Sequence, residues 1–309
     1  MAIPRRIFGK TGLSVSVLGF GGSEVGYQEV AQKTVDAILG RALDAGVNLI
    51  DTAECYADSE RLIGRALSKR RHDIVLMTKC GHAMIESAGD RADGFARDEW
   101  DPAMLSASID RSLQRLGTDY VDVIQFHSPE RSVLDNDEAI AVLQKAREAG
   151  KARFIGCSLD GHDAAHAVAM GVFDTLQISV SVADQQAIDL VLPKAIERGV
   201  GVIAKRPIAN AVWKNRRAPS DWYTRPYWDR LQKLDYDFLR GDSSEAVATA
   251  LSFTLATPGV HSAIVGTTRP ENVDRNAALV AGKGIEQSSY DSIRERWRKV
   301  ARKDWIGQR

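Results

Sequence analysis

The sequence predicts a single (β/α)8 barrel domain that spans residues 1–309. Two observations support this fold class: short apolar runs alternate with segments of helical periodicity, and eight such strand–helix units follow one another. Strands that alternate with helices pair in parallel through right-handed crossovers, and eight units close into a barrel. An open doubly wound sheet is the alternative. It favours a Gly-x-Gly-x-x-Gly turn after the first strand, a spacing that Gly19, Gly21 and Gly22 do not have.

A hairpin over residues 5–17, with its turn at 9–12, opens the chain and is expected to cap the barrel rather than join its sheet. The expected barrel strands are apolar runs that cover residues 17–22, 47–51, 74–78, 121–126, 153–157, 175–180, 200–204 and 262–265. The helices after them have apolar residues at helical spacing and cover residues 32–45, 59–68, 102–115, 137–149, 162–170, 187–198, 243–256 and 270–279. An extra C-terminal helix over 288–303 is expected to dock on the barrel.

Residues 210–240 interrupt the repeat after the seventh strand and carry many aromatic side chains. An insertion of this length is expected to form a wall or lid over the strand ends, where Trp213, Trp222 and Trp228 would contact the substrate. A helix packed on the outside of the barrel is the alternative. Basic residues among the aromatic ones leave room for an anionic substrate as well as for a flat or apolar one.

The composition favours a protein that acts on small molecules. Lys and Arg together number 41, as do Asp and Glu, so no basic field attracts nucleic acid or a membrane surface. No apolar run reaches the roughly 18 residues that a membrane helix needs, and the start lacks a signal-peptide core, so we expect a cytoplasmic protein. Cys55, Cys80 and Cys157 are odd in number and widely spaced, which predicts free thiols and neither a disulfide framework nor a zinc site.

Ionisable side chains lie at the ends of three consecutive predicted strands. Asp51 ends the second strand, Lys79 follows the third, and His127 follows the fourth. The strands of a barrel open their C-terminal ends on one face, where sites of this fold lie, so these side chains are expected to be neighbours. Tyr56, in the loop beyond Asp51, adds a phenol to the group.

This combination is suited to proton transfer to a carbonyl oxygen. A tyrosine with the usual pKa of about 10 is a weak acid, but the Lys79 ammonium is expected to lower the pKa of Tyr56 while Asp51 keeps the lysine charged. His127 can donate a hydrogen bond to the same oxygen. Two other interpretations stay open: a polar network that only stiffens the barrel mouth, and a lyase or isomerase in which Lys79 forms a Schiff base.

Long stretches of the chain resemble the aldo-keto reductase family. The similar stretches are residues 46–56 (Gly-Val-Asn-Leu-Ile-Asp-Thr-Ala-Glu-Cys-Tyr), 78–79, 112–127, 150–158 and 264–276. The resemblance implies a barrel reductase that binds a nicotinamide cofactor, usually NADPH and otherwise NADH, and passes hydride to an aldehyde or ketone. It implies further that Tyr56 donates the proton, that Asp51 and Lys79 adjust the pKa of Tyr56, and that His127 orients the carbonyl.

The resemblance also assigns contacts to the nicotinamide. Ser158 and Gln177 match the residues that hold its carboxamide, although Leu159 replaces the asparagine that usually follows the serine. Lys205 stands where the family commonly stacks an aromatic residue on the ring. We hypothesise that Lys205 or Arg206 turns toward a cofactor phosphate or an anionic substrate. Unaltered cofactor affinity and substrate range in Lys205→Tyr would contradict this hypothesis.

The helix after the last strand is expected to bind the far end of the cofactor. Its N-terminus offers free N–H groups and a positive dipole to a phosphate, and the Arg269 guanidinium can bind the 2′-phosphate bidentately. The positions assigned to this end are Gly266, Thr267, Arg269, Asn272, Arg275 and Asn276. Many family members have a phosphate-binding arginine where this chain has Asn272, which weakens the preference for NADPH.

A cofactor-binding regulatory subunit, similar to the potassium-channel β subunits that share this fold, is the alternative to an enzyme. The complete set of Tyr56, Asp51, Lys79 and His127 favours the enzyme.

Overall fold

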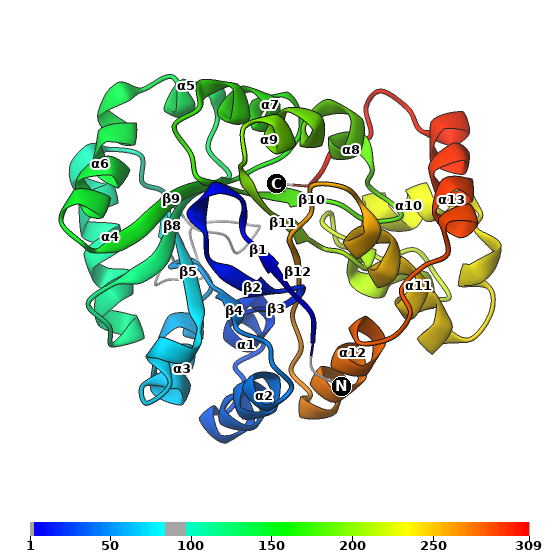
Figure 1. Ribbon diagram of the computed structural model, residues 1–309, viewed down its shortest axis with the longest axis horizontal. Coiled ribbons are helices and arrows are strands. Elements are labelled where there is room, and N and C mark those ends of the chain that lie inside the picture. The colour runs from blue at the N-terminus through cyan, green and yellow to red at the C-terminus, as the bar shows by residue number, and fades with distance from the viewer. Residues whose placement is uncertain (1–2, 84–96, 309) are drawn as a thin grey trace.

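Eight parallel strands close into a barrel, as the alternation of strands and helices predicts (Figure 1). The structure is a computed structural model that describes residues 3–83 and 97–308. In chain order the barrel strands are β3 (Leu18–Gly21), β4 (Leu49–Asp51), β5 (Val75–Cys80), β8 (Val121–His127), β9 (Ala152–Ser158), β10 (Thr175–Ser179), β11 (Gly201–Lys205) and β12 (Ser262–Val265). Each strand pairs in parallel with the next, and β12 pairs with β3 to close the ring.

A longer helix follows each barrel strand except β10, as expected. These helices are α2 (Gln32–Asp44), α3 (Ser59–Leu67), α4 (Pro102–Leu116), α6 (Asp137–Glu148), α7 (Gly161–Met170), α11 (Ser243–Ala256) and α12 (Pro270–Val280), and the C-terminal α13 (Gln287–Val300) follows α12. The prediction of one helix over 187–198 is wrong, because two shorter helices occupy this segment: α8 (Gln186–Leu190) and α9 (Leu192–Glu197). Pro193 causes the break, since it has no N–H to donate and its ring clashes with the carbonyl one turn earlier.

The sequence does not predict several short elements, because they hold too few residues to show a periodicity. They are the helices α1 (Ser23–Tyr27) and α5 (Arg131–Leu134), the turn η2 (Arg71–Asp73), and the two-stranded ribbon of β6 (His82–Ala83) and β7 (Arg97–Asp98). The helix α1 and the strand β6 both lie beside residues of the candidate site.

The N-terminal hairpin caps one end of the barrel, as predicted. It consists of β1 (Arg5–Ile7), the 3-10 turn η1 (Gly9–Thr11) and β2 (Ser14–Ser16). Phe8 is fully buried in an apolar cluster with barrel residues, and its ring lies against Gly201 at the start of β11. A side chain at Gly9 would overlap the Gly199 carbonyl, so this close approach requires glycine. The hairpin therefore closes the N-terminal end of the barrel and leaves the opposite end for the site.

Residues 210–240 form mostly a packed helical segment. Its elements are η3 (Ala209–Lys214), α10 (Arg225–Leu234) and η4 (Asp237–Leu239). Tyr227 and Tyr236 are buried in a second apolar cluster with Trp297 of α13 and Trp305 beyond it. This part of the insertion is thus the packed helix considered as the alternative to a wall or lid. Tyr223, in contrast, reaches Arg206 just beyond β11, so part of the insertion borders the barrel mouth.

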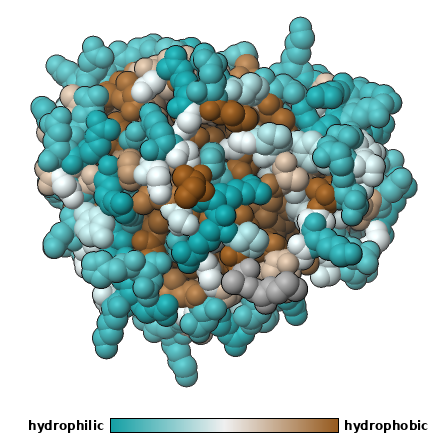
Figure 2. Space-filling view, in the orientation of Figure 1, coloured by the Kyte–Doolittle hydropathy of each residue, from teal (hydrophilic) through white to brown (hydrophobic). Residues whose placement is uncertain are grey.

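The helices within residues 3–83 and 97–308 include none with the length and apolar character needed to cross a membrane. Figure 2 shows one face of the molecule, on which hydrophilic side chains surround smaller hydrophobic areas. The three cysteines are free and buried, as predicted.

Candidate active site

Asp51 and Lys79 form a buried ion pair at the C-terminal ends of β4 and β5. The Lys79 ammonium lies 2.6 Å from Asp51 Oδ2 and donates a second hydrogen bond, of 2.8 Å, to the Thr52 carbonyl oxygen. Each of the two charged residues is only 1% exposed. Removal of either charge would leave the other buried without compensation, so the pair holds two neighbouring strand ends together.

The second oxygen of Asp51 is held by amide groups from other strands. Gln125 on β8 donates to Asp51 Oδ1 at 3.3 Å, and Gln177 on β10 donates to it at 2.9 Å. Both amides are buried. These donors orient the carboxylate, so that its other oxygen stays directed at Lys79.

Tyr56 lies beside this pair, in the loop between β4 and α3. Its ring centroid is 4.9 Å from the Lys79 ammonium and 5.5 Å from the centroid of the His127 ring, which meets it edge-on at 83°. The structure therefore brings together Asp51, Tyr56, Lys79 and His127, as the positions of the strand ends predict. Their catalytic roles stay a prediction at this point.

The expected lowering of the Tyr56 pKa is wrong for this structure. Burial raises the pKa of Tyr56 well above its usual value, and the nearby Asp51 carboxylate raises it further. The Lys79 ammonium does not reverse this shift, because its charge is balanced by Asp51 at 2.6 Å. Tyr56 is consequently a neutral phenol, the form that holds a proton to donate.

The loop that carries Tyr56 packs directly on α1. A side chain at Gly26 would overlap the Tyr56 carbonyl oxygen. We therefore expect Gly26→Ala to displace this loop, to destabilise the fold by about 1–3 kcal/mol as overpacking does, and to lower the turnover rate. Thermal unfolding and steady-state kinetics measure the two effects.

Gly40→Ala is the matched control for this prediction. Gly40 lies within α2, and an added Cβ there meets no atom within 4 Å. Alanine is favoured over glycine inside a helix, so Gly40→Ala is expected to raise stability by roughly 0.5–1 kcal/mol. Equal unfolding temperatures for the two variants would contradict the close packing of α1 on the Tyr56 loop.

His127 is a neutral imidazole at the end of β8. Burial, reinforced by the neighbouring Lys79 and His82, lowers the pKa of His127 well below its usual range. Its Nδ1 lies 3.2 Å from Cys55 Sγ, and burial raises the pKa of the Cys55 thiol to about 12. The thiol therefore keeps its proton and can donate it to Nδ1, which leaves Nε2 as the ring atom available to a ligand.

Ser158 and Gln177, assigned to the nicotinamide carboxamide, lie side by side on β9 and β10. Ser158 Oγ donates to Gln177 Oε1 at 3.0 Å. Leu159, which replaces the usual asparagine, is 2% exposed and belongs to the main apolar core. It therefore offers no polar group to the mouth, as the sequence indicates.

Lys205, at the end of β11, forms an ion pair with a residue that the sequence analysis overlooked. Its ammonium lies 2.9 Å from Asp160 Oδ2, and the lysine is 8% exposed. Burial lowers the pKa of Lys205, whereas Asp160 opposes this shift. The lysine charge is thus balanced by a carboxylate, which reduces its repulsion of an oxidised nicotinamide ring.

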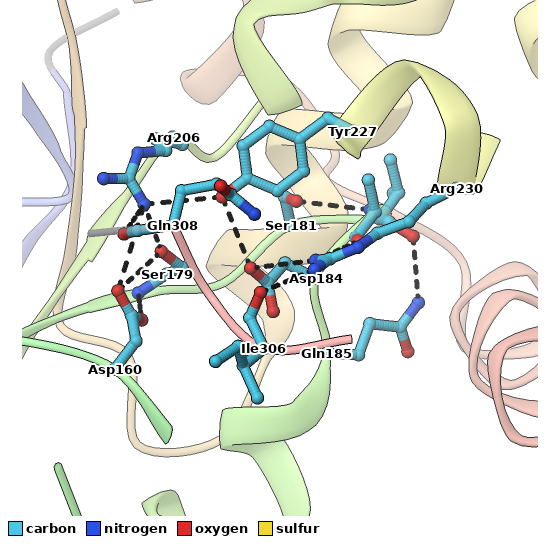
Figure 3. Close-up of polar contacts among 12 residues, drawn as sticks. Asp160, Ser179, Ser181, Asp184, Gln185, Arg206, Tyr227, Arg230, Ile306 and Gln308 are labelled. Atoms are coloured by element: carbon cyan, nitrogen blue, oxygen red, sulfur yellow. Dashed lines mark hydrogen bonds and ion pairs between the residues drawn. The ribbon is translucent and has the colours of Figure 1, made fainter. Parts of the chain in front are cut away.

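The Arg206 guanidinium is engaged by protein groups in the same region (Figure 3). It donates to Ser179 Oγ at 2.7 Å, to the Tyr223 hydroxyl at 2.5 Å and to the Gln308 carbonyl oxygen at 2.6 Å. Its backbone adopts a φ of 56°, a conformation uncommon for residues other than glycine. The hypothesis that Lys205 or Arg206 turns toward a phosphate or an anionic substrate stays a proposal.

The C-terminal tail, residues 305–308, runs past this network (Figure 3). The Ile306 carbonyl oxygen accepts a hydrogen bond of 2.6 Å from Arg230, and the Gln308 carbonyl oxygen accepts the one from Arg206. A side chain at Gly307 would overlap the Asp160 carboxyl group. The tail therefore borders the mouth on the side of β9 and β11.

Sequence reasoning missed Asp160, Asp184 and Arg230 in this network. Asp160 follows the end of β9, and a carboxylate just beyond a strand end is the same signal that identifies Asp51. Asp184 accepts from Tyr227 at 3.3 Å and pairs with Arg230 at 3.4 Å, while burial raises the pKa of Asp184 to about 7. No sequence spacing indicates these contacts, because they join segments far apart in the chain.

The positions assigned to the far end of the cofactor gather at the start of α12. Thr267 Oγ1 accepts from the Arg269 N–H at 3.1 Å and from the Asn272 amide at 3.0 Å. Gly266 lies against the Glu24 carboxyl group, so that a side chain there would overlap it. Arg269 and Arg275 are exposed and Asn276 is partly buried. The first turn of α12 has no side-chain cap, but Pro270 has no N–H and the Asn272 N–H donates to the Arg269 carbonyl oxygen, so an anion would meet mainly the Glu271 N–H and the positive end of the helix dipole.

The three tryptophans assigned to the substrate lie in different surroundings. Trp213 and Trp228 pack against the second apolar cluster. Trp222 is 53% exposed and meets Tyr223 edge-on at 5.6 Å. Because Tyr223 contacts Arg206 at the mouth, Trp222 has the most suitable position of the three. Their contact with a substrate stays a prediction.

Known proteins resemble this chain over nearly its whole length. A model of the aldo/keto reductase family matches residues 17–298. The L-galactose dehydrogenase of Arabidopsis thaliana is 31% identical over 310 residues, which cover 94% of this chain and 93% of that protein. The D-threo-aldose 1-dehydrogenase of a Pseudomonas species is 29% identical over 304 residues, which cover 87% of this chain and 91% of that protein.

A solved structure extends the likeness to three dimensions. The holo form of an aldo-keto reductase from Bacillus halodurans matches with a TM-score of 0.82 at 25% identity, over 95% of this chain and 96% of that one. Because the family model spans nearly the whole described barrel, and a relative above 30% identity matches over nearly its full length, this chain is a member of the aldo/keto reductase family.

Proposed function

We propose that the chain catalyses the reversible, NAD(P)H-dependent reduction of an aldehyde or ketone to an alcohol, with Tyr56 as the proton donor. The observation that carries this proposal is the convergence of a neutral phenol, a buried ammonium–carboxylate pair and a neutral imidazole at one end of the barrel. Membership of the aldo/keto reductase family supports it.

In this proposal Tyr56 gives its proton to the carbonyl oxygen as that oxygen gains negative charge. The phenolate left behind is stabilised by the Lys79 ammonium, 4.9 Å from the ring centroid. Asp51 and the Thr52 carbonyl oxygen keep this ammonium in place. The arrangement is pre-formed in the structure, so little reorganisation accompanies proton transfer.

His127 orients the carbonyl group. With Nδ1 engaged by Cys55, Nε2 can donate a hydrogen bond to the carbonyl oxygen beside Tyr56. A neutral imidazole is the appropriate form, since a second cation would compete with the phenol as the proton donor.

The residues present fit a nicotinamide cofactor. Ser158 and Gln177 offer a hydroxyl and an amide for the carboxamide, and the start of α12 offers the Glu271 N–H and the positive end of the helix dipole to a phosphate. The exposed Arg269 is the candidate for a 2′-phosphate, which favours NADPH over NADH. When bound, the reduced nicotinamide supplies the hydride that reaches the carbonyl carbon.

The assay follows oxidation of NADPH and of NADH with a panel of aldehydes and ketones. Because two relatives are dehydrogenases of L-galactose and of D-threo-aldoses, the panel also includes aldoses with NADP⁺ and NAD⁺ in the opposite direction. Turnover of at least one compound with wild-type protein supports the proposal. Cofactor binding without turnover of any compound would favour the regulatory-subunit alternative.

A Schiff-base lyase or isomerase is disfavoured by the state of Lys79. A nucleophilic lysine must be neutral, whereas Lys79 donates to a carboxylate and a backbone carbonyl. Borohydride should therefore trap no substrate adduct on Lys79, and a trapped adduct would support the lyase instead. The free thiols are consistent with a reducing compartment, and we propose the cytoplasm.

A further inference from the structure

Three side chains of the types that bind zinc meet at the barrel mouth. Among residues 3–83 and 97–308, one ligand atom each from Cys55, His82 and His127 lies within 4.8 Å of the others. We propose that Cys55, His82 and His127 bind a thiophilic divalent cation, Zn²⁺ above all, and that the bound cation inhibits the enzyme. The wide spacing of the cysteines along the chain predicts no zinc site. That spacing does not report residues brought together by different strand ends.

The donor set and its dimensions suit this cation. A thiolate and two imidazoles are common zinc ligands, and three protein ligands leave a fourth tetrahedral position for water. Zn–S distances of about 2.3 Å and Zn–N distances of about 2.0–2.1 Å imply donor separations near 3.5 Å. Cys55 Sγ and His127 Nδ1 are already 3.2 Å apart, so the three ligands mainly require an inward movement of His82 to reach the cation together. The thiol releases its proton to solvent as the cation binds.

The site is accessible and supported by neighbouring groups. Cys55 is 4% exposed, whereas both imidazoles are partly exposed, so a cation can enter from the mouth. The Trp100 ring meets His82 edge-on at 5.5 Å. The Tyr27 hydroxyl donates to the Cys55 carbonyl oxygen at 3.0 Å. Such outer contacts orient metal ligands.

Electrostatics permit a dication at this point. Lys79 is the cation that acts most strongly on His127, but Asp51 balances its charge at 2.6 Å, as Asp160 balances that of Lys205 at 2.9 Å. The Cys55 thiolate would compensate one of the two metal charges.

Inhibition follows from the dual position of His127. This part of the inference rests on the proposed function, whereas metal binding itself does not. Coordination fixes the His127 ring, which meets Tyr56 edge-on at 5.5 Å, so that the ring can no longer adjust to a carbonyl group. It also adds positive charge beside the phenol. We expect saturating Zn²⁺ to lower the turnover rate at least tenfold and a chelator to restore it.

Cobalt binding tests the site independently of activity. Apo protein is titrated with Co²⁺, whose absorption shows a thiolate-to-metal charge-transfer band only when sulfur is a ligand. We expect the band in the wild type, its loss in Cys55→Ser, and weakened binding in His82→Asn. His166→Asn is the control, because His166 lies on α7, 2.7 Å from Asp135 and outside the cluster.

Two measurements could overturn the proposal. A wild-type titration without the charge-transfer band, or a band that survives in Cys55→Ser, would exclude the site even if the chain proved inactive toward every carbonyl. In an active protein, His82→Asn should retain basal turnover and require at least tenfold more Zn²⁺ for half-inhibition. Equal sensitivity of wild type and His82→Asn to Zn²⁺ would show that inhibition arises elsewhere.

Discussion

Replacement of Tyr56 by phenylalanine is expected to lower the turnover rate by about 10²–10⁴-fold, the usual contribution of a positioned general acid. The phenylalanine ring preserves the edge contact with His127 and the position 4.9 Å from the Lys79 ammonium, so only the transferable proton is lost. Affinity for the cofactor should stay nearly unchanged. Single-turnover kinetics with NADPH and fluorescence titration of the cofactor measure the two quantities.

Tyr27→Phe is the matched control, because it removes a nearby phenol. The Tyr27 ring lies 5.6 Å from that of Tyr56, and its hydroxyl donates to the Cys55 backbone carbonyl oxygen. The turnover rate of the Tyr27→Phe variant should differ from that of the wild type only a few-fold. A Tyr56→Phe enzyme as active as Tyr27→Phe would refute the assignment of the proton donor.

Replacement of Lys79 by methionine is expected to affect stability as well as activity. The change leaves the Asp51 carboxylate charged, 1% exposed and without its ion-pair partner. Loss of one partner of a buried pair typically costs about 3–5 kcal/mol. Gln125 and Gln177 still donate to Asp51, so the lower end of this range is expected. Turnover should also fall, since the phenolate form of Tyr56 loses its stabilising charge.

The double variant Asp51→Asn/Lys79→Met separates the two effects. It removes both charges, so much of the free energy of unfolding should return while turnover stays low. Lys151→Met provides a surface comparison, because the Lys151–Asp110 pair is solvent-exposed and such pairs contribute about 0–1 kcal/mol. Urea unfolding of all variants gives the comparison. Similar losses for Lys79→Met and Lys151→Met would show that the buried pair has no special role in stability.

Local sequence patterns predict the barrel and the meeting of its strand ends well. Each strand and helix has its own periodicity, and parallel strands of a closed barrel must present their C-terminal ends on one face. The positions of Asp51, Lys79 and His127 therefore follow from the order of the strands. The same reasoning fails for α8 and α9, where a single Pro193 outweighs an otherwise helical pattern.

The sequence by itself determined the fold class, the cap at the N-terminal end and the meeting of Asp51, Lys79 and His127 at the mouth. Only the tertiary structure decided the protonation states and partners of those residues. The pKa of Tyr56 depends on burial and on a lysine already paired with Asp51, and these are properties of the folded environment. Several contacts at the mouth join distant segments of the chain, so no local pattern encodes them. They are the contacts of Asp160 with Lys205, of Cys55 with His127, and of Arg206 with the C-terminal tail.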